Sequence, residues 1–286
     1  MQKLIVILGQ TATGKSALAV KMAKKFKGEI ISADSRQVYT GLDIGTGKIT
    51  PKEMRGVPHY MIDIVKPKDR FTVAEYKDQA LEKIEVILAK NKIPIITGGT
   101  GFYIDAITKG VVFPTVPPNK KLRKELEQKN VEQLLKMLKK LDPIRAKDIE
   151  NKNEQNNKVR IIRAIEIAKA LGKVPKILEI KPKYKFIKIG VMLPKEELAK
   201  KINTRVRAMF KSGLLKEIQK LKRLGVSEKR LREFGFEYNK PTVEKVITQT
   251  VKYAKRQNTW FKREKNIKWF SPSEYKEVEK YIKTKI

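Results

Sequence analysis

The sequence predicts an α/β protein with a doubly wound parallel sheet and a helical insertion domain. Short apolar runs occur at residues 4–8, 29–34, 60–65, 93–99, 186–193 and 267–271, and most are separated by amphipathic segments. Strands that alternate with helices form parallel sheets, because each helix returns the chain to the end of the sheet at which the previous strand began. Between residues 114 and 182 the chain is charged and helix-patterned. We therefore expect a core of residues 1–113 and 183–286, ending in C-terminal helices, and a helical insertion at 114–182.

The first apolar run leads directly into GQTATGKS, residues 9–16. This matches the G-x-x-x-x-G-K-[ST] pattern, in which backbone N–H groups and a helix N-terminus surround a phosphate. In such a loop Lys15 reaches the outer phosphates and the Ser16 hydroxyl ligates Mg²⁺. The pattern predicts a P-loop NTPase-like core that binds a di- or triphosphate. The expected binding residues are Gly9, Gln10, Thr11, Ala12, Thr13, Gly14, Lys15 and Ser16.

The second apolar run ends at Asp34, which precedes Ser35, Arg36 and Gln37. Ligands of doubly wound sheets bind beyond the carboxyl ends of the strands, so Asp34 is expected in the crevice of the phosphate loop. Its carboxylate can serve as a general base, a magnesium ligand or a helix N-cap, and the residues alone leave these roles open. The polar, glycine-bearing stretch 43–48 that follows could close over a ligand.

The run at 93–99 leads into TGGTGFY, residues 97–103. A glycine-rich strand end brings backbone close to a ligand, and Thr100 can cap the next helix or touch substrate. Apart from Asp34, none of the apolar runs ends in the Asp or Asp-Glu pair with which ATPases hold magnesium and align water. This absence disfavours motors and helicases, and it favours a loop that holds a diphosphate leaving group without ATP hydrolysis.

The composition indicates a polyanionic partner. The 286 residues include 65 Lys and Arg against 31 Asp and Glu, a formal net charge of +34. Nucleic acid is the most natural partner for such an excess. The alternative, a lysine-rich genome that decorates the surface, should raise Glu together with Lys. No cysteine and one histidine, His59, exclude disulfides and His-pair metal sites. No run of 18 apolar residues occurs, so we expect a cytoplasmic protein without membrane contact.

Two basic clusters are candidates for nucleic-acid contact. Arg160 and Arg163, with Lys158, share one predicted helix, and the two arginines lie on one face toward phosphates. Lys255, Arg256, Lys262 and Arg263 surround Trp260 and Phe261. These aromatic residues can stack on bases or pack in the core, and core packing is favoured.

The order and spacing of these motifs resemble the bacterial tRNA dimethylallyltransferases, also called tRNA isopentenyltransferases. The resemblance is co-linear over nearly the whole chain. It comprises GQTATGKS (9–16), ISADSRQVYTGLDIGTGK (31–48), PHYMIDI (58–64), FTVAEYKDQA (71–80), IPIITGGTGFY (93–103), VRIIRAIEI (159–167), FGFEY (234–238) and YAKRQNTWFKR (253–263). It implies transfer of a dimethylallyl group from dimethylallyl diphosphate to the exocyclic amine of the adenosine 3′-adjacent to the anticodon in tRNA, with release of diphosphate.

The resemblance also implies roles for individual residues. Asp34 matches the family's general base. Lys15, Arg232 and a magnesium ion on Ser16 would offset charge on the departing diphosphate. The insertion domain would clasp the anticodon stem-loop of tRNA around a flipped-out adenosine, and we expect a monomer. The implied tRNA contacts are Asp34, Ser35, Arg36, Gln37, Thr100, Arg123, Val159, Arg160, Ile161, Ile162 and Arg163.

The chain departs from the family pattern at two places. Asn156-Asn157 stands where the family usually has Asn-Asp, and Gly235-Phe236-Glu237 stands where it commonly has Gly-Tyr followed by Lys or Arg. Both departures are expected outside the diphosphate pocket, where they would alter tRNA contacts. The rival functions are prenyl transfer to free adenine nucleotides, a small-molecule kinase and a non-catalytic RNA-binding protein.

Overall fold

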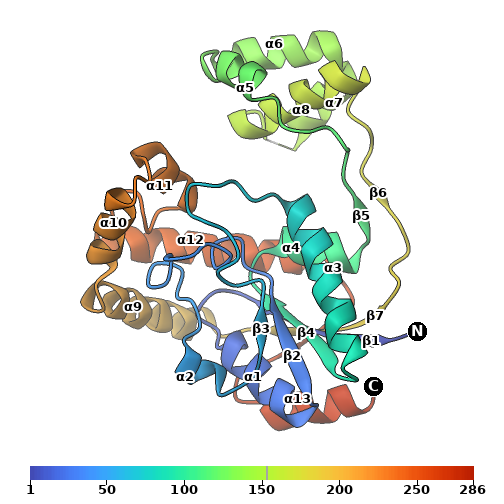
Figure 1. Ribbon diagram of the computed structural model, residues 1–286, viewed down its shortest axis with the longest axis vertical. Coiled ribbons are helices and arrows are strands. Elements are labelled where there is room, and N and C mark those ends of the chain that lie inside the picture. The colour runs from blue at the N-terminus through green and yellow to red at the C-terminus, as the bar shows by residue number, and fades with distance from the viewer. Residues whose placement is uncertain (153) are drawn as a thin grey trace. The chain divides into compact units, whose positions relative to one another are not determined.

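The computed structural model describes residues 1–152 and 154–286, and these form two compact units (Figure 1). The first unit comprises Met1–Gly110 and Lys181–Ile286, and the second comprises Val111–Ile180. None of the helices in the described part of the chain is long and apolar enough to span a membrane.

The first unit is built on a six-stranded sheet of order β3-β2-β4-β1-β7-β8, in which every pair is parallel. Its strands are Lys3–Gly9 (β1), Gly28–Ser32 (β2), His59–Tyr60 (β3), Ile93–Gly98 (β4), Lys185–Val191 (β7) and Ile267–Phe270 (β8). The central strand β1 is buried from Leu4 to Gly9, as expected for a parallel strand covered on both faces. The doubly wound α/β fold expected from the alternating runs is confirmed.

Alternate residues of β1 face two separate hydrophobic layers. Leu4, Val6 and Leu8 pack with residues of α3 and α4, whereas Ile5 and Ile7 pack with residues of α1 and α13. The helices of this unit are α1 (Lys15–Lys25), α2 (Pro51–Met54), α3 (Val73–Ala89), α4 (Gly101–Thr108), α9 (Lys195–Lys211), α10 (Leu214–Arg223), α11 (Glu228–Phe234), α12 (Val243–Phe261) and α13 (Tyr275–Lys283). Because side chains alternate along a strand, one apolar run supports both layers.

A further cluster joins the loop after β2 to the C-terminal helices. Val38, Tyr39 and Leu42 pack against Leu214 of α10 and Phe234 of α11. This contact brings residues from the last third of the chain to the carboxyl ends of the strands, where the sequence predicts the phosphate loop.

The second unit is a helical bundle with its own core. Its helices are α5 (Lys120–Glu127), α6 (Val131–Leu141), α7 (Pro143–Asn151) and α8 (Lys158–Leu171). Each begins after an Asn or Asp whose side chain accepts a backbone N–H of the first turn, the usual N-cap. The short antiparallel strands Val111–Val112 (β5) and Leu178–Glu179 (β6) also belong to this unit. The sequence pattern did not predict these two strands.

Candidate active site

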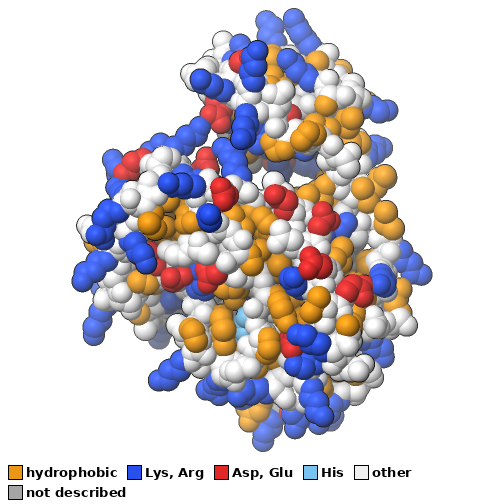
Figure 2. All heavy atoms as spheres, viewed as in Figure 1, with side chains coloured by type: hydrophobic (Ala, Val, Ile, Leu, Met, Phe, Trp, Pro, Cys, Tyr) orange, Lys and Arg blue, Asp and Glu red, His pale blue; other side chains and the backbone are white. Residues whose placement is uncertain are grey.

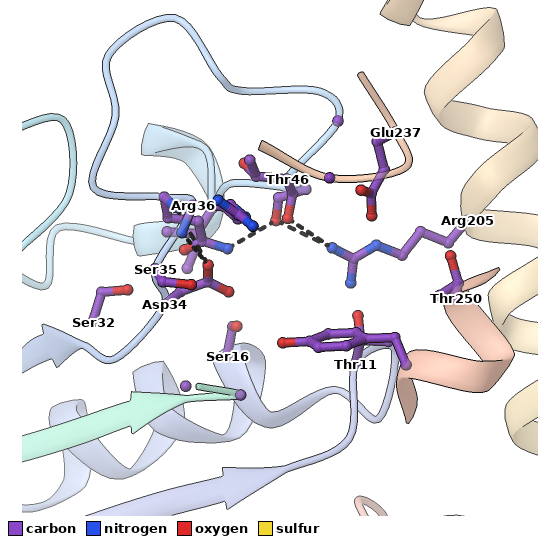
Figure 3. A pocket seen from close by; sticks show the side chains of 18 of the residues that line it. Thr11, Ser16, Ser32, Asp34, Ser35, Arg36, Thr46, Arg205, Glu237 and Thr250 are labelled. Carbon is purple, nitrogen blue, oxygen red and sulfur yellow. Dashed lines mark hydrogen bonds between the residues drawn. The ribbon is translucent and has the colours of Figure 1, made fainter. Parts of the chain in front are cut away.

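A cavity of about 350 Å³ in the first unit lies where β1, β2 and β4 end (Figure 3). Residues of the phosphate loop, the turn after β2, the end of β4 and the C-terminal helices line it together. They include Thr11, Lys15, Ser16, Asp34, Ser35, Arg36, Gln37, His59, Thr97, Gly99, Arg205, Glu237, Tyr253, Arg256 and Gln257. The structure therefore brings Lys15, Ser16 and Asp34 into one cavity, as the sequence predicted.

The phosphate loop is held in shape by its own polar groups. Helix α1 begins at Lys15, directly after Gly14. The Thr13 hydroxyl donates a hydrogen bond to the Gln10 carbonyl oxygen at 2.8 Å, and Lys15 Nζ donates to the same oxygen at 3.1 Å. The ammonium group of Lys15 is thus kept over the loop, where a phosphate would meet it.

Helix α12 fastens this loop from outside the motif. Gln257 Oε1 accepts the Thr11 backbone N–H at 2.8 Å, and Gln257 Nε2 donates to the Gly99 carbonyl oxygen at 2.9 Å. Gln10 Nε2 donates to the Ala254 carbonyl oxygen at 3.1 Å. One buried amide thereby joins the phosphate loop to the end of β4. Sequence reasoning did not identify Gln257 as a site residue.

Asp34 has one oxygen engaged in the local turn. Its Oδ1 accepts the backbone N–H groups of Arg36 at 2.9 Å and Gln37 at 3.3 Å. These bonds orient the carboxylate so that it lines the cavity (Figure 3). Thr100 does not cap α4, because its side chain makes no cap bond there. Its hydroxyl oxygen instead accepts the Ser35 N–H at 3.0 Å, which fixes the turn after Asp34.

Arg205 of α9 is a cation of this cavity that the sequence analysis missed. Its Nη2 donates to the Thr46 and Gly47 carbonyl oxygens at 3.2 and 3.5 Å. A Cβ at Gly47 (φ 56°) would lie 1.9 Å from that nitrogen, so a larger residue there would displace the guanidinium from this position. Burial, and then repulsion from Arg205, lower the pKa of Lys15 to about 8, while Asp34 acts in the opposite direction. Two cations, Lys15 and Arg205, thus line one cavity and repel each other.

Two residues lie elsewhere than expected. Arg232 is exposed on α11 and is not among the residues that line the cavity. Glu237, which was expected outside the diphosphate pocket, lines the same cavity as the phosphate loop. Burial raises its pKa to about 7; Asp34 adds to that effect, and Arg36 and Arg205 oppose it. The turn after α11 brings this carboxyl inward.

The stretch 43–48 is held by a buried carboxylate. Glu217 of α10 accepts the backbone N–H groups of Asp43, Ile44 and Gly45 at 2.9, 2.7 and 3.1 Å, and the Tyr238 hydroxyl at 2.9 Å. Since Gly45, Thr46 and Gly47 line the cavity, Glu217 fixes one wall of the site. The stretch is therefore a supported wall in this structure.

The cavity fits a magnesium ion that takes most of its ligands from a phosphate substrate and water. Ser16 lines the cavity, and the buried Thr97 Oγ1 has no hydrogen-bond partner. Among the described residues no group of three or more His, Cys, Asp or Glu could hold a metal ion by itself. Because Mg²⁺ usually keeps several waters and binds substrate phosphates, one hydroxyl ligand beside a polar wall suffices.

In the second unit, two predicted tRNA contacts support the fold. The buried Glu166 carboxylate accepts Arg123 Nε at 2.9 Å, Arg123 Nη2 at 2.7 Å and the Asn119 N–H at 2.6 Å. Arg163 also pairs with Glu166 and donates to the Val116 carbonyl oxygen at 2.8 Å. These contacts turn Arg123 and Arg163 toward their own unit.

The remaining predicted positions on α8 differ in exposure. Val159 is 79% exposed, and Arg160 pairs with Glu154 at the surface. Ile161 and Ile162 are 0% and 6% exposed in the hydrophobic core of this unit. Helical periodicity places these two side chains on the inner face, so any tRNA contact at these positions would involve the backbone, and the expectation stays a prediction.

Trp260 and Phe261 follow the favoured interpretation. Phe261 is buried in the core, and Trp260 packs against that core while its Nε1 donates to Asp105 Oδ2 at 3.1 Å. Core packing is confirmed for both. Their neighbour Arg256 lines the cavity.

Comparison with known proteins identifies consistent relatives. The IPP transferase family model matches residues 37–264. The tRNA dimethylallyltransferase of Acetivibrio thermocellus is 39% identical, with 99% of this chain and 96% of that protein covered. That of Halothermothrix orenii is 40% identical, with coverages of 98% and 91%. The solved structure of full-length tRNA isopentenylpyrophosphate transferase from Bacillus halodurans aligns with a TM-score of 0.73 at 34% identity, over 100% of this chain and 97% of that one. A eukaryotic dimethylallyltransferase acting on tRNA aligns with a TM-score of 0.73 at 28% identity, over 91% and 70%.

Proposed function

This chain belongs to the IPP transferase family, and from that premise we propose that it transfers a dimethylallyl group from dimethylallyl diphosphate to the exocyclic amine of the adenosine 3′ of the anticodon in tRNA. One observation carries the proposal: a single cavity joins an anion-binding loop to the carboxylate of Asp34. The loop suits a diphosphate leaving group, and the carboxylate suits an amine that must lose a proton.

The donor diphosphate binds between the phosphate loop and Arg205 in this proposal. Among the described residues no side chain caps α1, so its first-turn N–H groups can bind an anion, and Lys15 and Arg205 supply two positive charges. A diphosphate between them would offset their mutual repulsion, so the two cations favour diphosphate binding. Ser16 would hold magnesium, which supplies additional positive charge to the departing diphosphate when bound.

The acceptor amine is a weak nucleophile, because its lone pair is delocalised into the adenine ring. In the proposed step the nitrogen attacks the allylic carbon, the carbon–oxygen bond breaks, and its electron pair leaves with the diphosphate. Asp34 accepts the amine proton through the oxygen that the turn does not use. The adenosine must leave its stack to reach this cavity, and Ser35, Arg36 and Gln37 lie where they can contact it.

The wider tRNA contact rests on charge. Lys and Arg side chains line much of the outline of each unit (Figure 2), in keeping with the net charge of +34. We assign the anticodon stem to the helical second unit, with the exposed Val159 and Arg160 as candidate contacts. We further propose that the enzyme is a monomer and that it works in the cytoplasm, where tRNA is available.

The test is incubation of the protein with magnesium, dimethylallyl diphosphate and an anticodon stem-loop RNA, followed by mass spectrometry of the nucleosides. Prenylated adenosine is expected from the RNA and not from free AMP. Arg205→Ala and Arg232→Ala form a matched pair: the first should raise the donor Kd by roughly tenfold or more, and the second should leave it within about twofold. Transfer to AMP alone, or phosphoryl transfer from ATP, would contradict the proposal.

A further inference from the structure

We propose that Glu237 is a specificity-determining residue, whose carboxyl binds the edge of the substrate adenine next to the amine that faces Asp34. The inference rests on the proposed function, because it assigns a contact to the acceptor base. Its starting point is the juxtaposition of Glu237 with Asp34, Arg36 and Arg205 in one cavity.

The placement of Glu237 separates it from the phosphate end of the cavity. In Figure 3, Ser16 and Thr11 lie below Asp34 and Arg205, whereas Arg36 and Glu237 lie above them. Gly235, at φ 130°, makes room for this arrangement, because a Cβ there would lie 2.9 Å from Glu237 Oε2. A diphosphate on the loop therefore leaves the Glu237 end of the cavity for the base.

Hydrogen bonding distinguishes the half-buried Glu237 from the buried glutamates of the described residues. Glu29, Glu166 and Glu217 each accept at least three hydrogen bonds from neighbouring groups. For Glu237, the described residues provide only its own backbone amide, and no other residue's side chain bonds or pairs with it. Its oxygens are not among the buried polar atoms that lack a partner, so the carboxyl faces the cavity with hydrogen-bonding capacity left for a substrate group.

The chemistry of the group favours adenine. A protonated carboxyl presents a hydroxyl donor beside a carbonyl acceptor, and an adenine edge presents a ring nitrogen beside an N–H of the exocyclic amine. The two patterns are complementary and allow two parallel hydrogen bonds. The raised pKa of Glu237, about 7, makes the protonated form available near neutral pH. Asp34 supports protonation, Arg36 and Arg205 oppose it, and Lys15 and Arg256 also face this cavity.

The experiment combines variants of Glu237 with substrates that lack a single ring nitrogen of the adenine. Wild type, Glu237→Gln and Glu237→Ala are assayed on anticodon stem-loops that carry adenosine, 1-deazaadenosine or 7-deazaadenosine at the target position. Loss of the ring nitrogen that Glu237 contacts should lower kcat/KM of wild type about five- to tenfold more than that of Glu237→Ala. Glu237→Gln should keep this discrimination and show it up to pH 9, since an amide offers both a donor and an acceptor at every pH.

The outcomes separate this inference from the function beneath it. If wild type prenylates the adenosine stem-loop, but each deaza substrate lowers kcat/KM equally in wild type and Glu237→Ala, the base contact is refuted and the proposed function stands. If wild type does not prenylate that RNA, both fail. A donor Kd that rises more than tenfold in Glu237→Ala would assign the residue to the phosphate end and also overturn the inference.

Discussion

Replacement of Glu217 by alanine should both destabilise the protein and disable its site. The carboxylate accepts four hydrogen bonds of 2.7–3.1 Å, from three consecutive N–H groups and the Tyr238 hydroxyl. Two of these donors, the Gly45 N–H and the Tyr238 hydroxyl, form buried bonds, so water cannot readily replace the acceptor. At about 1.5–3 kcal/mol for each of these two buried bonds to a charged acceptor, Glu217→Ala should lower the free energy of unfolding by about 3–6 kcal/mol.

The assay is urea denaturation followed by steady-state kinetics at a temperature where the variant remains folded. Tyr238→Phe removes a single bond and should cost about 1–2 kcal/mol. Glu82→Ala, which removes an exposed carboxylate paired with Lys83, should change stability by less than about 0.5 kcal/mol. Because the released stretch lines the cavity, kcat/KM of Glu217→Ala should fall roughly tenfold or more. An unfolding midpoint equal to that of Glu82→Ala would refute the reasoning.

Three further predictions concern charge. Asp34→Asn should lower the single-turnover rate by about 10²- to 10⁴-fold with an unchanged donor Kd, and a loss below tenfold would leave Asp34 only its role in the turn. Since the pKa of Lys15 is lowered to about 8, its ammonium group loses a proton above that pH. Calorimetry should then show donor affinity falling by up to tenfold per pH unit above pH 8, because the neutral amine no longer attracts the diphosphate. Lys15→Ala should abolish this pH dependence. Arg163→Ala should lower the melting temperature, because it breaks the contact with buried Glu166. Arg160→Ala should instead flatten the slope of log tRNA affinity against log salt by about one unit. A lower melting temperature for Arg160→Ala and a flatter salt slope for Arg163→Ala would show that Arg160 supports the fold and Arg163 contacts tRNA.

The part of the site that could be predicted from sequence is the part made by neighbouring residues. The phosphate loop is a local structure, because one strand, one turn and one helix provide its backbone groups. The position of Asp34 follows from the rule that ligands lie beyond the ends of parallel strands. The same local logic placed Arg160 and Arg163 on one helix, but it could not show that Arg163 meets a buried carboxylate.

The rest of the site depends on contacts between distant segments. Arg205 meets Gly47 across 158 positions, Glu217 meets Gly45 across 172, and Gln257 meets Thr11 across 246. Each belongs to a helix rich in charged and polar residues, where an inward-facing side chain has the same local sequence context as a solvated one. Only the packing of α9, α10 and α12 against the carboxyl ends of the strands distinguishes them.

The location of the carboxylates connects the fold to the reaction. ATPases of this architecture place an acid at the end of a strand next to the phosphate loop, where it holds magnesium and aligns water. Here β4, which pairs with β1, ends in Thr97 and Gly98, and the acid stands at the end of β2 as Asp34. The Thr97 hydroxyl beside the loop cannot remove a proton from water at neutral pH, so it cannot replace that acid. Asp34 and Glu237 instead line the cavity together with the cations at the phosphate end. In the proposed function, the phosphate loop holds the diphosphate, and Asp34 and Glu237 serve the second substrate, which attacks from the other end.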